Sequence, residues 1–415
     1  MHICVIGAGV VGLTTAYFLQ SEGHTITLVD REPGAGRGAS AANGAQLSYG
    51  FVAPLADASV LTKLPSLLFA RDSPLKLHLR LDREQLSWGL QFLRHANSAD
   101  SQSTTAALLR LAQLSREFIE PLIEGEGIAC HFARGGKIVV YPDSSSLSAA
   151  RRQVAYQATH GSFQTVLTPT QCVDHEPTLE AYAKRISGGV WTPTDAVADC
   201  GAFCEQLGAL LARRGADLQF GRRVEHLDLQ GTNVRAVVTD TGALRADAYV
   251  LAAGTGARQL GQTAGLALPI YPLKGYSITV KPVDAATLPR VSITDVRRKV
   301  VFAPLGNSVR VAGFVEIGDL DEAIPPARIG ALLDVTREIF GYGVIDGDLQ
   351  PWAGLRPATP SGRPILGRTP VRNLHLNVGH GALGWTLAAG SARLLCDAVA
   401  GRASTIDSRP FAYSV

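Results

Sequence analysis

A glycine-rich turn near the start of the chain constrains the fold more than any other feature of the sequence. Residues 2–6 (HICVI) form a short apolar run, and the pattern G-x-G-x-x-G follows from Gly7 to Gly12. In such a turn the first glycine permits the bend, the second lets the backbone approach a pyrophosphate, and the third lets helix and strand pack closely. A helix is expected through TTAYFLQSE, ending at Gly23, and the apolar run TITLV then leads to Asp30. This order predicts a strand–turn–helix–strand unit that binds a dinucleotide.

Later parts of the chain favour FAD as that dinucleotide. Asp30 lies at the end of the second expected strand, where a carboxylate can accept hydrogen bonds from ribose hydroxyls. The chain leaves this unit after about 50 residues and returns at Gly254 and Gly256 and again at 379–384 (GHGALG). A helix starting at the last turn would place its positive end beside a flavin and stabilise negative charge on the reduced ring. The alternative is that these glycines only form turns.

Length and element order predict two domains. The chain has 415 residues, and expected strands alternate with helices at both ends with β-rich material between. We expect an α/β fold with a discontinuous Rossmann-like FAD-binding domain of residues 1–50, 198–268 and 350–415. Residues 51–197 and 269–349 are expected to form a second, α+β substrate domain built on a mixed β-sheet.

Charge and cysteine content exclude several other classes of protein. The formal charge is only +3, which gives no electrostatic reason to expect nucleic-acid binding. The six cysteines show no framework spacing, and Cys200 and Cys204 lack the further ligands of a zinc site, so we expect structural thiols and no metal. The start MHICVIGAG has no basic leader, and no run of 18 uncharged apolar residues exists. We expect a cytoplasmic protein.

Three longer blocks carry a resemblance to a known family. They are CVIGAGVVGLTTAYFL with VDREPGAGRGASAANGAQLS near the start, YPLKGYS at 271–277, and GLRPATPSGRPILGRTPVRNLHLNVGHGALGWTLAAGSARLL at 354–395. The chain resembles the FAD-dependent amine oxidoreductases of the D-amino-acid oxidase and glycine oxidase type, and among them the bacterial D-amino-acid dehydrogenases. The resemblance runs from residue 1 to about residue 402.

The resemblance implies an oxidative deamination of D-amino acids. A hydride leaves the substrate Cα for flavin N5, the imino acid hydrolyses to a 2-oxo acid and ammonia, and the electrons pass to a quinone-type acceptor. No strong base is required, because the cofactor supplies the difficult step. Three alternatives stay open: an oxidase that uses oxygen, an enzyme for a cyclic or N-substituted amino acid such as D-proline or a hydroxyproline, and a non-catalytic flavin subunit that relays electrons.

The resemblance also assigns candidate catalytic residues. Arg356, in the block GLRP, matches the residue that holds the substrate carboxylate. A guanidinium suits this task because it grips a carboxylate with two parallel hydrogen bonds and keeps its charge. An arginine in a structural or surface salt bridge is the alternative. His380 is a second candidate, although a histidine in a glycine-rich loop can equally be a turn residue.

One position departs from the family pattern. The family places a tyrosine beside the carboxylate-binding arginine, and the matching stretch KVVFAPL has Val301 there. Tyr276, Tyr271 or Tyr49 could supply a hydroxyl instead, or none does. Val301 predicts a wider and more apolar pocket, which suits a broad range of D-amino acids.

The same blocks predict the residues that contact FAD. Residues 40–47 match the loop beside the flavin and diphosphate, and residues 380–386 match the turn that faces the flavin's pyrimidine edge. The predicted contacts are Gly7, Gly9, Val10, Val11, Gly12, Asp30, Arg31, Ser40, Ala41, Asn43, Gly44, Ala45, Gln46, Leu47, Val224, Ala253, Gly254, Gly354, Gly381, Ala382, Leu383, Gly384, Trp385 and Thr386.

A segment rich in leucine and cations predicts a contact outside the active site. From Leu61 to Leu93 the chain carries LTKLPSLLFARDSPLKLHLRL, in which apolar residues are interspersed with lysine and arginine. Such a surface suits a peripheral contact with the inner face of the cell membrane or with an electron-transfer partner. The alternative is a helical lid whose apolar face packs on the substrate domain.

Overall fold

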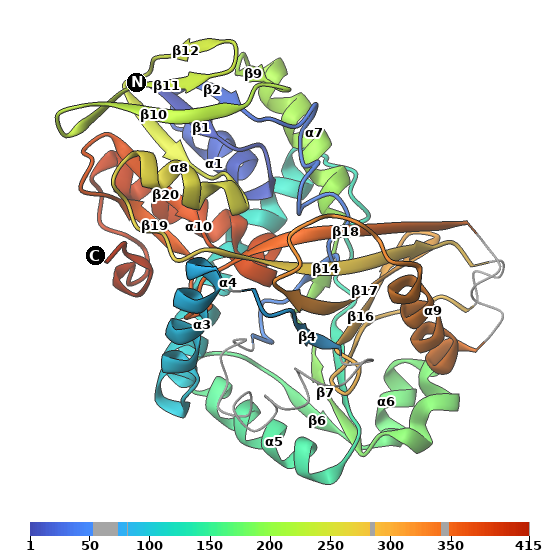
Figure 1. The fold of residues 1–415 in the computed structure, drawn as a ribbon. Coiled ribbons are helices and arrows are strands. Elements are labelled where there is room, and N and C mark those ends of the chain that lie inside the picture. The colour runs from blue at the N-terminus through green and yellow to red at the C-terminus, as the bar shows by residue number, and fades with distance from the viewer. Residues whose placement is uncertain (53–73, 81, 283–286, 342–347, 415) are drawn as a thin grey trace.

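The structure is a computed structural model, and it describes residues 1–52, 74–80, 82–282, 287–341 and 348–414 (Figure 1). These residues are organised mainly around two sheets, one of six strands and one of nine. Figure 1 shows the smaller sheet with the blue N-terminal strands, and the larger sheet crossing the molecule beside it. The mixed α/β fold predicted from the sequence is confirmed.

The six-stranded sheet contains the predicted strand–turn–helix–strand unit. Its order is β19 (Ile365–Arg368), β20 (Leu374–Val378), β13 (Ala248–Leu251), β1 (His2–Ile6), β2 (Thr25–Val29) and β9 (Asp217–Gln219). Strand β1 pairs in parallel with β2 and β13, and β19 is the antiparallel edge strand. The central strands are buried on both faces, as their continuous apolar sequences indicate.

Successive residues of β1 pack on opposite sides of this sheet. Ile3 and Val5 belong to a core with helices α1 (Val10–Ser21), α7 (Cys200–Arg213) and α10 (Gly384–Ala400). Cys4 and Ile6 pack with the three-stranded sheet and helix α8 (Ala257–Thr263). The three-stranded sheet consists of β10 (Val224–Gln230), β11 (Asn233–Thr239) and β12 (Gly242–Leu244). Helix α4 (Ser98–Gly125) packs against α10 through a further apolar cluster.

The nine-stranded sheet is mixed. Its order is β18 (Leu349–Ala358), β14 (Tyr271–Val280), β17 (Ser308–Ile317), β16 (Val300–Leu305), β15 (Ser292–Asp295), β5 (Lys137–Tyr141), β7 (Gly188–Thr192) and β6 (Thr165–Leu167), with β4 (Leu75–Leu77) parallel to β17. Helices α6 (Pro169–His175) and α9 (Pro326–Phe340), with the 3₁₀ helix η1 (Pro177–Arg185), pack on one face. Helix α5 (Ser144–Ala158) packs on part of the other face.

Strand β18 connects the two domains proposed from the sequence, because it belongs to one by prediction and pairs with a strand of the other. The sequence places residues 350–415 with the FAD-binding part, yet β18 pairs along its whole length with β14 of the nine-stranded sheet. A further short ladder joins β3 (Gln46–Leu47) to β8 (Ala196–Val197). Short 3₁₀ helices follow β13 and β20, namely η2 (Gly254–Gly256) and η5 (Gly381–Leu383), and η6 (Arg409–Phe411) lies near the C-terminus. The domain boundaries stay a proposal.

More than half of the predicted leucine-rich segment can be described. Residues 61–73 and 81 lie outside the described residues, whereas β4 and helix α3 (Arg83–His95) lie within them. Trp88 and Phe92 of α3 stack on one another and pack towards Tyr271. On the other side of the helix Leu86 and Leu90 are 53% and 61% exposed. Helix α3 therefore packs through one apolar face and exposes a second.

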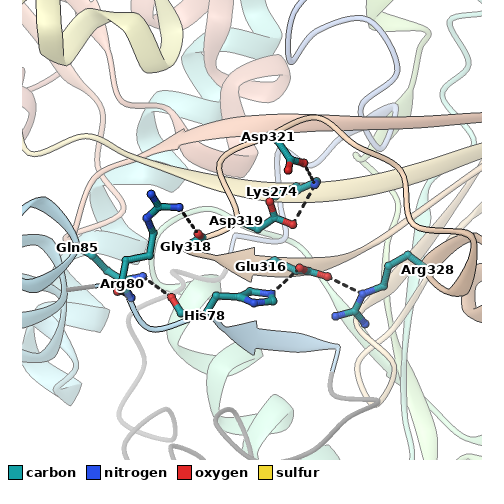
Figure 2. Close-up of polar contacts among 9 residues, drawn as sticks. All are labelled: His78, Arg80, Gln85, Lys274, Glu316, Gly318, Asp319, Asp321 and Arg328. Carbon is teal, nitrogen blue, oxygen red and sulfur yellow. Dashed lines mark hydrogen bonds and ion pairs between the residues drawn. The ribbon is translucent and has the colours of Figure 1, made fainter. Parts of the chain in front are cut away.

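A polar cluster lies where β4 pairs with β17 in the large sheet (Figure 2). His78, beside β4, contacts Glu316 through its Nε2 at 2.8 Å, and Arg328 donates to the same carboxylate at 2.6 Å. Lys274 is buried and donates to Asp319 at 3.0 Å and to Asp321 at 2.8 Å. His78, Glu316 and Asp319 have donor atoms close enough to hold a metal ion. Their oxygens already bind cationic side chains, and we assign no metal there.

The positions of the cysteines agree with the expected structural thiols. All six are free and buried. Among the described residues, no helix is both long and apolar enough to cross a membrane.

Candidate active site

A cavity of about 950 Å³ lies where the glycine-rich turn of the smaller sheet faces the larger sheet. Most of the predicted site residues line it. They are Gly7, Gly9, Val10, Val11, Asp30, Arg31, Ser40, Asn43, Gly44, Ala45, Gln46, Val224, Ala253, Gly254, Tyr276, Arg356 and His380, with every residue from Gly381 to Thr386. Five predicted residues are not among its lining: Gly12, Ala41, Leu47, Tyr271 and Gly354.

The glycines of the turn have different tasks. Gly7 has a φ of 113°, and a Cβ on Gly12 would lie 1.8 Å from the Gly7 carbonyl oxygen. Gly12 therefore permits the helix to start against the turn, which explains why it does not face the cavity. A Cβ on Gly9 would meet only Ser40 Oγ, at 3.4 Å, so the space in front of Gly9 is open to a ligand.

Asp30 holds the turn as well as facing the cavity. Its Oδ2 accepts from the Ala8 amide at 2.5 Å and its Oδ1 accepts from the Glu32 amide at 2.8 Å. Burial raises the pKa of Asp30 above its ordinary value, and the two amide donors offset only part of this rise. The carboxylate thus ties the end of β2 to the turn after β1, and the oxygens have further lone pairs for a ribose hydroxyl.

Two helices begin at the cavity, and their amides suit a cofactor with a diphosphate. Helix α1 starts after Gly9, which has no side chain to cap it, and its first turn carries no acidic residue. Helix α10 starts after Leu383, again without a side-chain cap. The amides at such helix starts favour negative groups. The open space at Gly9, which carries no Cβ, the two helix starts and the volume of the cavity fit an extended dinucleotide.

Arg356 is the cationic group at the β18 end of the cavity. It belongs to β18, and its Nη1 donates to the carbonyl of Phe314 at 3.2 Å. Among the described residues, no carboxylate lies within ion-pair distance of its guanidinium. Burial lowers the pKa of Arg356 to about 10, so the side chain stays charged at neutral pH. A half-buried arginine without a counter-ion is prepared to bind an anion.

A pair of glycines makes room for Arg356 and Trp352. Gly275 of β14 lies directly opposite Gly354 of β18. A Cβ on Gly275 would lie 2.2 Å from the Arg356 guanidinium, and one on Gly354 would lie 2.2 Å from the Trp352 ring. The two side chains therefore cover the glycine pair, and both line the cavity. Gly354 thus lies beneath the Trp352 ring and leaves space for it, and does not itself line the cavity.

The neighbouring wall is apolar. Val301, Ala312 and Phe314 line the cavity, and Val301 lies close to Gly44 of the loop predicted beside the flavin. Phe314 has a φ of 60°, which is rare for a bulky residue, and it lies where the pairing of β14 and β17 shifts register. This irregularity presents the Phe314 carbonyl to Arg356. The prediction that Val301 leaves an apolar wall agrees with this arrangement.

The candidate tyrosines separate into two groups. Tyr276 lines the cavity, and its buried hydroxyl has no hydrogen-bond partner among the described residues. Burial raises the pKa of Tyr276 to about 12, so the hydroxyl is neutral. Tyr271 packs against Trp88 instead, and Tyr49 is buried away from the cavity lining. Of the three tyrosines only Tyr276 belongs to the cavity lining, and its ring packs in the apolar cluster beside helix α9.

His380 is buried in the turn before α10. Its Nε2 lies 3.0 Å from Ser391 Oγ, and burial lowers its pKa to about 3. The ring is therefore neutral at physiological pH and fixes the turn to helix α10. A role for His380 in proton transfer stays a prediction.

Sequence reasoning missed several lining residues. Lys137, Phe51, Trp352 and Phe314 line the cavity but belong to no motif. Lys137 and Phe51 come from parts of the chain where nothing in the sequence indicates a ligand. Of the four, Trp352 had the clearest signal in the sequence, because it lies two residues before Gly354 and four before Arg356 on one strand.

Comparison with known proteins gives the family of the chain. The model of the family described as "FAD dependent oxidoreductase" (DAO) matches residues 2–398. The chain is 44% identical to "D-amino acid dehydrogenase 2" of Ralstonia nicotianae, covering 100% of both chains. It is 43% identical to the protein of the same name from Pseudomonas aeruginosa, covering 98% of this chain and 97% of that one. Among solved structures, glycine oxidase from Geobacillus kaustophilus has the same fold, with a TM-score of 0.79, 21% identity, and 99% and 98% of the two chains covered. The chain belongs to the FAD-dependent oxidoreductase family.

Proposed function

We propose that this protein is a dehydrogenase that converts D-amino acids to 2-oxo acids and ammonia. The observation that carries the proposal is Arg356, a half-buried cation without a counter-ion among the described residues, in the wall of the cavity of an FAD-dependent family. The names of the relatives from Ralstonia nicotianae and Pseudomonas aeruginosa support the D-configuration of the substrate.

The residues of this chain bind and orient the substrate. Arg356 holds the substrate carboxylate, and this fixes the direction of the Cα–H bond. Val301, Ala312 and Trp352 receive the side chain and exclude water from the reacting carbon. Bound FAD supplies the chemistry, by accepting the hydride from the substrate Cα. Tyr276 can accept or donate one hydrogen bond as a neutral hydroxyl.

The breadth of the substrate range follows from this wall. The wall of Val301, Ala312 and Trp352 offers methyl, methylene and aromatic surface. Because Val301 stands where the family has a tyrosine, this position offers no hydroxyl. A side chain therefore gains from apolar burial, at roughly 0.8 kcal/mol for each methylene group. We expect alanine, valine, leucine and proline in their D forms to be substrates, and D-aspartate and D-glutamate to be poor ones.

An anaerobic substrate panel tests the proposal. The yellow holoenzyme is mixed with D-alanine, D-leucine, D-proline and D-aspartate, and with the L-enantiomers, while flavin absorbance is followed. Bleaching by apolar D-amino acids and release of the matching 2-oxo acid is the expected result. If no amino acid bleaches the flavin, or if the L-enantiomers react faster, the proposal is wrong.

The acceptor is proposed to be a quinone. The names of the relatives are those of dehydrogenases, which pass electrons to acceptors other than oxygen. After anaerobic reduction by D-alanine, a soluble quinone and air-saturated buffer are added to separate samples. We expect the quinone to restore the flavin absorbance at least tenfold faster. Faster recovery in air would identify an oxidase instead.

Helix α3 supports a peripheral contact with the cytoplasmic face of the membrane, where such a quinone would lie. Leu86, Leu90 and Leu93 share its exposed side and are 53%, 61% and 40% exposed. Arg83 and Arg94 lie on the same helix. Leucines beside cations suit an anionic lipid surface.

Cosedimentation with phosphatidylglycerol vesicles tests this contact. The triple variant with Leu86, Leu90 and Leu93 changed to Gln is compared with the wild type at low salt. Phe163→Gln is the matched control, because Phe163 is 75% exposed and lies outside α3. We expect only the triple variant to stay in the supernatant. Equal sedimentation of all three proteins would exclude α3 as the contact.

A further inference from the structure

Lys137 is a cation buried in the cavity wall that the proposed reaction does not use. It is 4% exposed and lines the cavity. Its Nζ donates to Ser48 Oγ at 2.8 Å and lies 4.8 Å from the centre of the Phe51 ring. An ammonium group carries three donors, and Ser48 is its hydrogen-bond partner among the described residues. Lys137 therefore has donors to spare inside the cavity wall.

Asp195, the counter-ion of Lys137, accepts no hydrogen bond from the ammonium group. Asp195 Oδ2 lies 4.0 Å from Lys137 Nζ, beyond hydrogen-bond distance, and this oxygen has no hydrogen-bond partner. The other oxygen, Oδ1, accepts from the Gly50 amide at 2.8 Å. Burial raises the pKa of Asp195 to about 6 and lowers the pKa of Lys137. Buried charges are costly unless their hydrogen bonds are satisfied, so an open pair beside a cavity points to a further partner.

Ser48 connects Lys137 to the two loops predicted beside the flavin. The Ser48 amide donates to Thr386 Oγ1 at 3.0 Å, and Thr386 Oγ1 donates to the Gln46 carbonyl at 3.4 Å. Gln46 and Thr386 both line the cavity. Ser48 is therefore the single residue that connects the Lys137 ammonium to the contact between the loop of 40–47 and the start of α10.

Lys137 cannot belong to the carboxylate site. Its strand β5 is separated from β18, which carries Arg356, by β15, β16, β17 and β14. At about 4.8 Å between neighbouring strands, the two strands lie roughly 24 Å apart in the sheet. A single small amino acid bound at Arg356 does not reach across that distance. The partner of Lys137 is therefore sought in the cofactor.

We propose that the Lys137 ammonium contacts the ring end of bound FAD and makes the flavin easier to reduce. Reduction adds negative charge to the ring, and a fixed cation in a poorly solvated wall stabilises that charge. Lys137 acts directly on the cofactor in this proposal, and Ser48 orients its ammonium group. The proposal depends on FAD as the cofactor and is independent of the substrate, because a chemical reductant can replace the amino acid.

The test is the midpoint potential of the flavin in Lys137→Met holoenzyme, measured by reductive titration against a reference dye with FAD in excess. Methionine retains the length of the chain and removes the charge. Asp195 can then take up a proton, since its pKa is already raised, and no unpaired charge stays buried. We expect the equilibrium constant for two-electron reduction to fall at least tenfold, which lowers the potential by about 30 mV.

Two further variants separate this effect from a structural one. Lys274→Met is the matched control, because Lys274 is equally buried in the same sheet but pairs with Asp319 and Asp321 outside the cavity (Figure 2). It should leave the potential unchanged, and Lys137→Arg should restore most of the wild-type value. If Lys137→Met does not yield folded holoenzyme, Lys137→Gln is measured in its place. A potential equal to that of the wild type in the neutral variant would overturn the proposal.

Discussion

The guanidinium of Arg356 lies over Gly275, at a distance where a single methyl group would displace it. A Cβ on Gly275 would be 2.2 Å from Arg356 Nη2 and 2.4 Å from Cζ. The glycine belongs to β14 and the arginine to β18, so the position of the cation depends on a residue of the neighbouring strand. No motif of the sequence connects the two residues.

Gly275→Ala should therefore impair substrate binding without disturbing the flavin. The added methyl meets the flexible end of an arginine, so the fold can adjust by moving the guanidinium. A displacement of about 1 Å in a positioning group can cost roughly 100-fold in rate. We expect kcat/KM for D-alanine to fall at least tenfold, with an unchanged flavin spectrum. Gly330→Ala is the control, since nothing lies within 4 Å of a Cβ there. An unimpaired Gly275→Ala enzyme would place the carboxylate elsewhere.

Arg356→Ala should nearly abolish the oxidation of amino acids. Loss of a buried, charge-assisted pair costs about 2–5 kcal/mol, which is roughly a 30- to several-thousand-fold loss in kcat/KM. Arg356→Lys should recover only part of this loss, because an ammonium cannot form the two parallel hydrogen bonds of a guanidinium. Steady-state kinetics with D-alanine and a dye acceptor give the comparison. Normal turnover by Arg356→Ala would refute the assigned role.

Substitution of the second and third glycines of the turn should give two different results. Gly9→Val places a side chain in the open space of the cavity and should raise the dissociation constant for FAD at least tenfold while the apoprotein stays folded. Gly12→Val brings a Cβ to within 1.8 Å of the Gly7 carbonyl and should destabilise the fold itself. Circular dichroism and flavin fluorescence separate the outcomes. Full FAD content in folded Gly9→Val would contradict the cofactor assignment.

The parts of the fold with local signals could be predicted from the sequence. Strands β1 and β2, the turn between Gly7 and Gly12, and the long helices α4 and α10 follow from apolar patterns and glycine positions that lie within about 30 residues. The loops of 40–47 and 380–386 were found through resemblance, and their residues line one cavity.

The remaining site residues depend on pairing between distant strands. The glycine pair Gly275 and Gly354 becomes meaningful only once β14 and β18 are in register. Lys137 faces the cavity because β5 alternates its side chains between the two faces of the sheet, and the register of that strand is set by β7 and β15. Tyr271 was predicted, with Tyr276 and Tyr49, as a residue that could supply the missing hydroxyl. Tyr276 lies five positions after Tyr271, and this odd offset places the two rings on opposite faces of β14, in separate apolar clusters.

Acid should destabilise the protein in part through His380. Its pKa is about 3 in the folded protein against an ordinary value of 6.5, because burial disfavours the charged ring. Between these two pH values the unfolded chain binds a proton at this residue that the folded chain does not, so stability falls as the pH falls below 6.5. At about pH 4.5 the loss amounts to roughly 2–3 kcal/mol. His380→Asn removes the titrating group, and the exposed His226→Asn serves as the control. In urea unfolding with saturating FAD, we expect the His380 variant to lose less stability than the wild type between pH 7 and about pH 4.5, whereas the control should behave like the wild type. An equal loss in all three proteins would mean that His380 is protonated in the folded state.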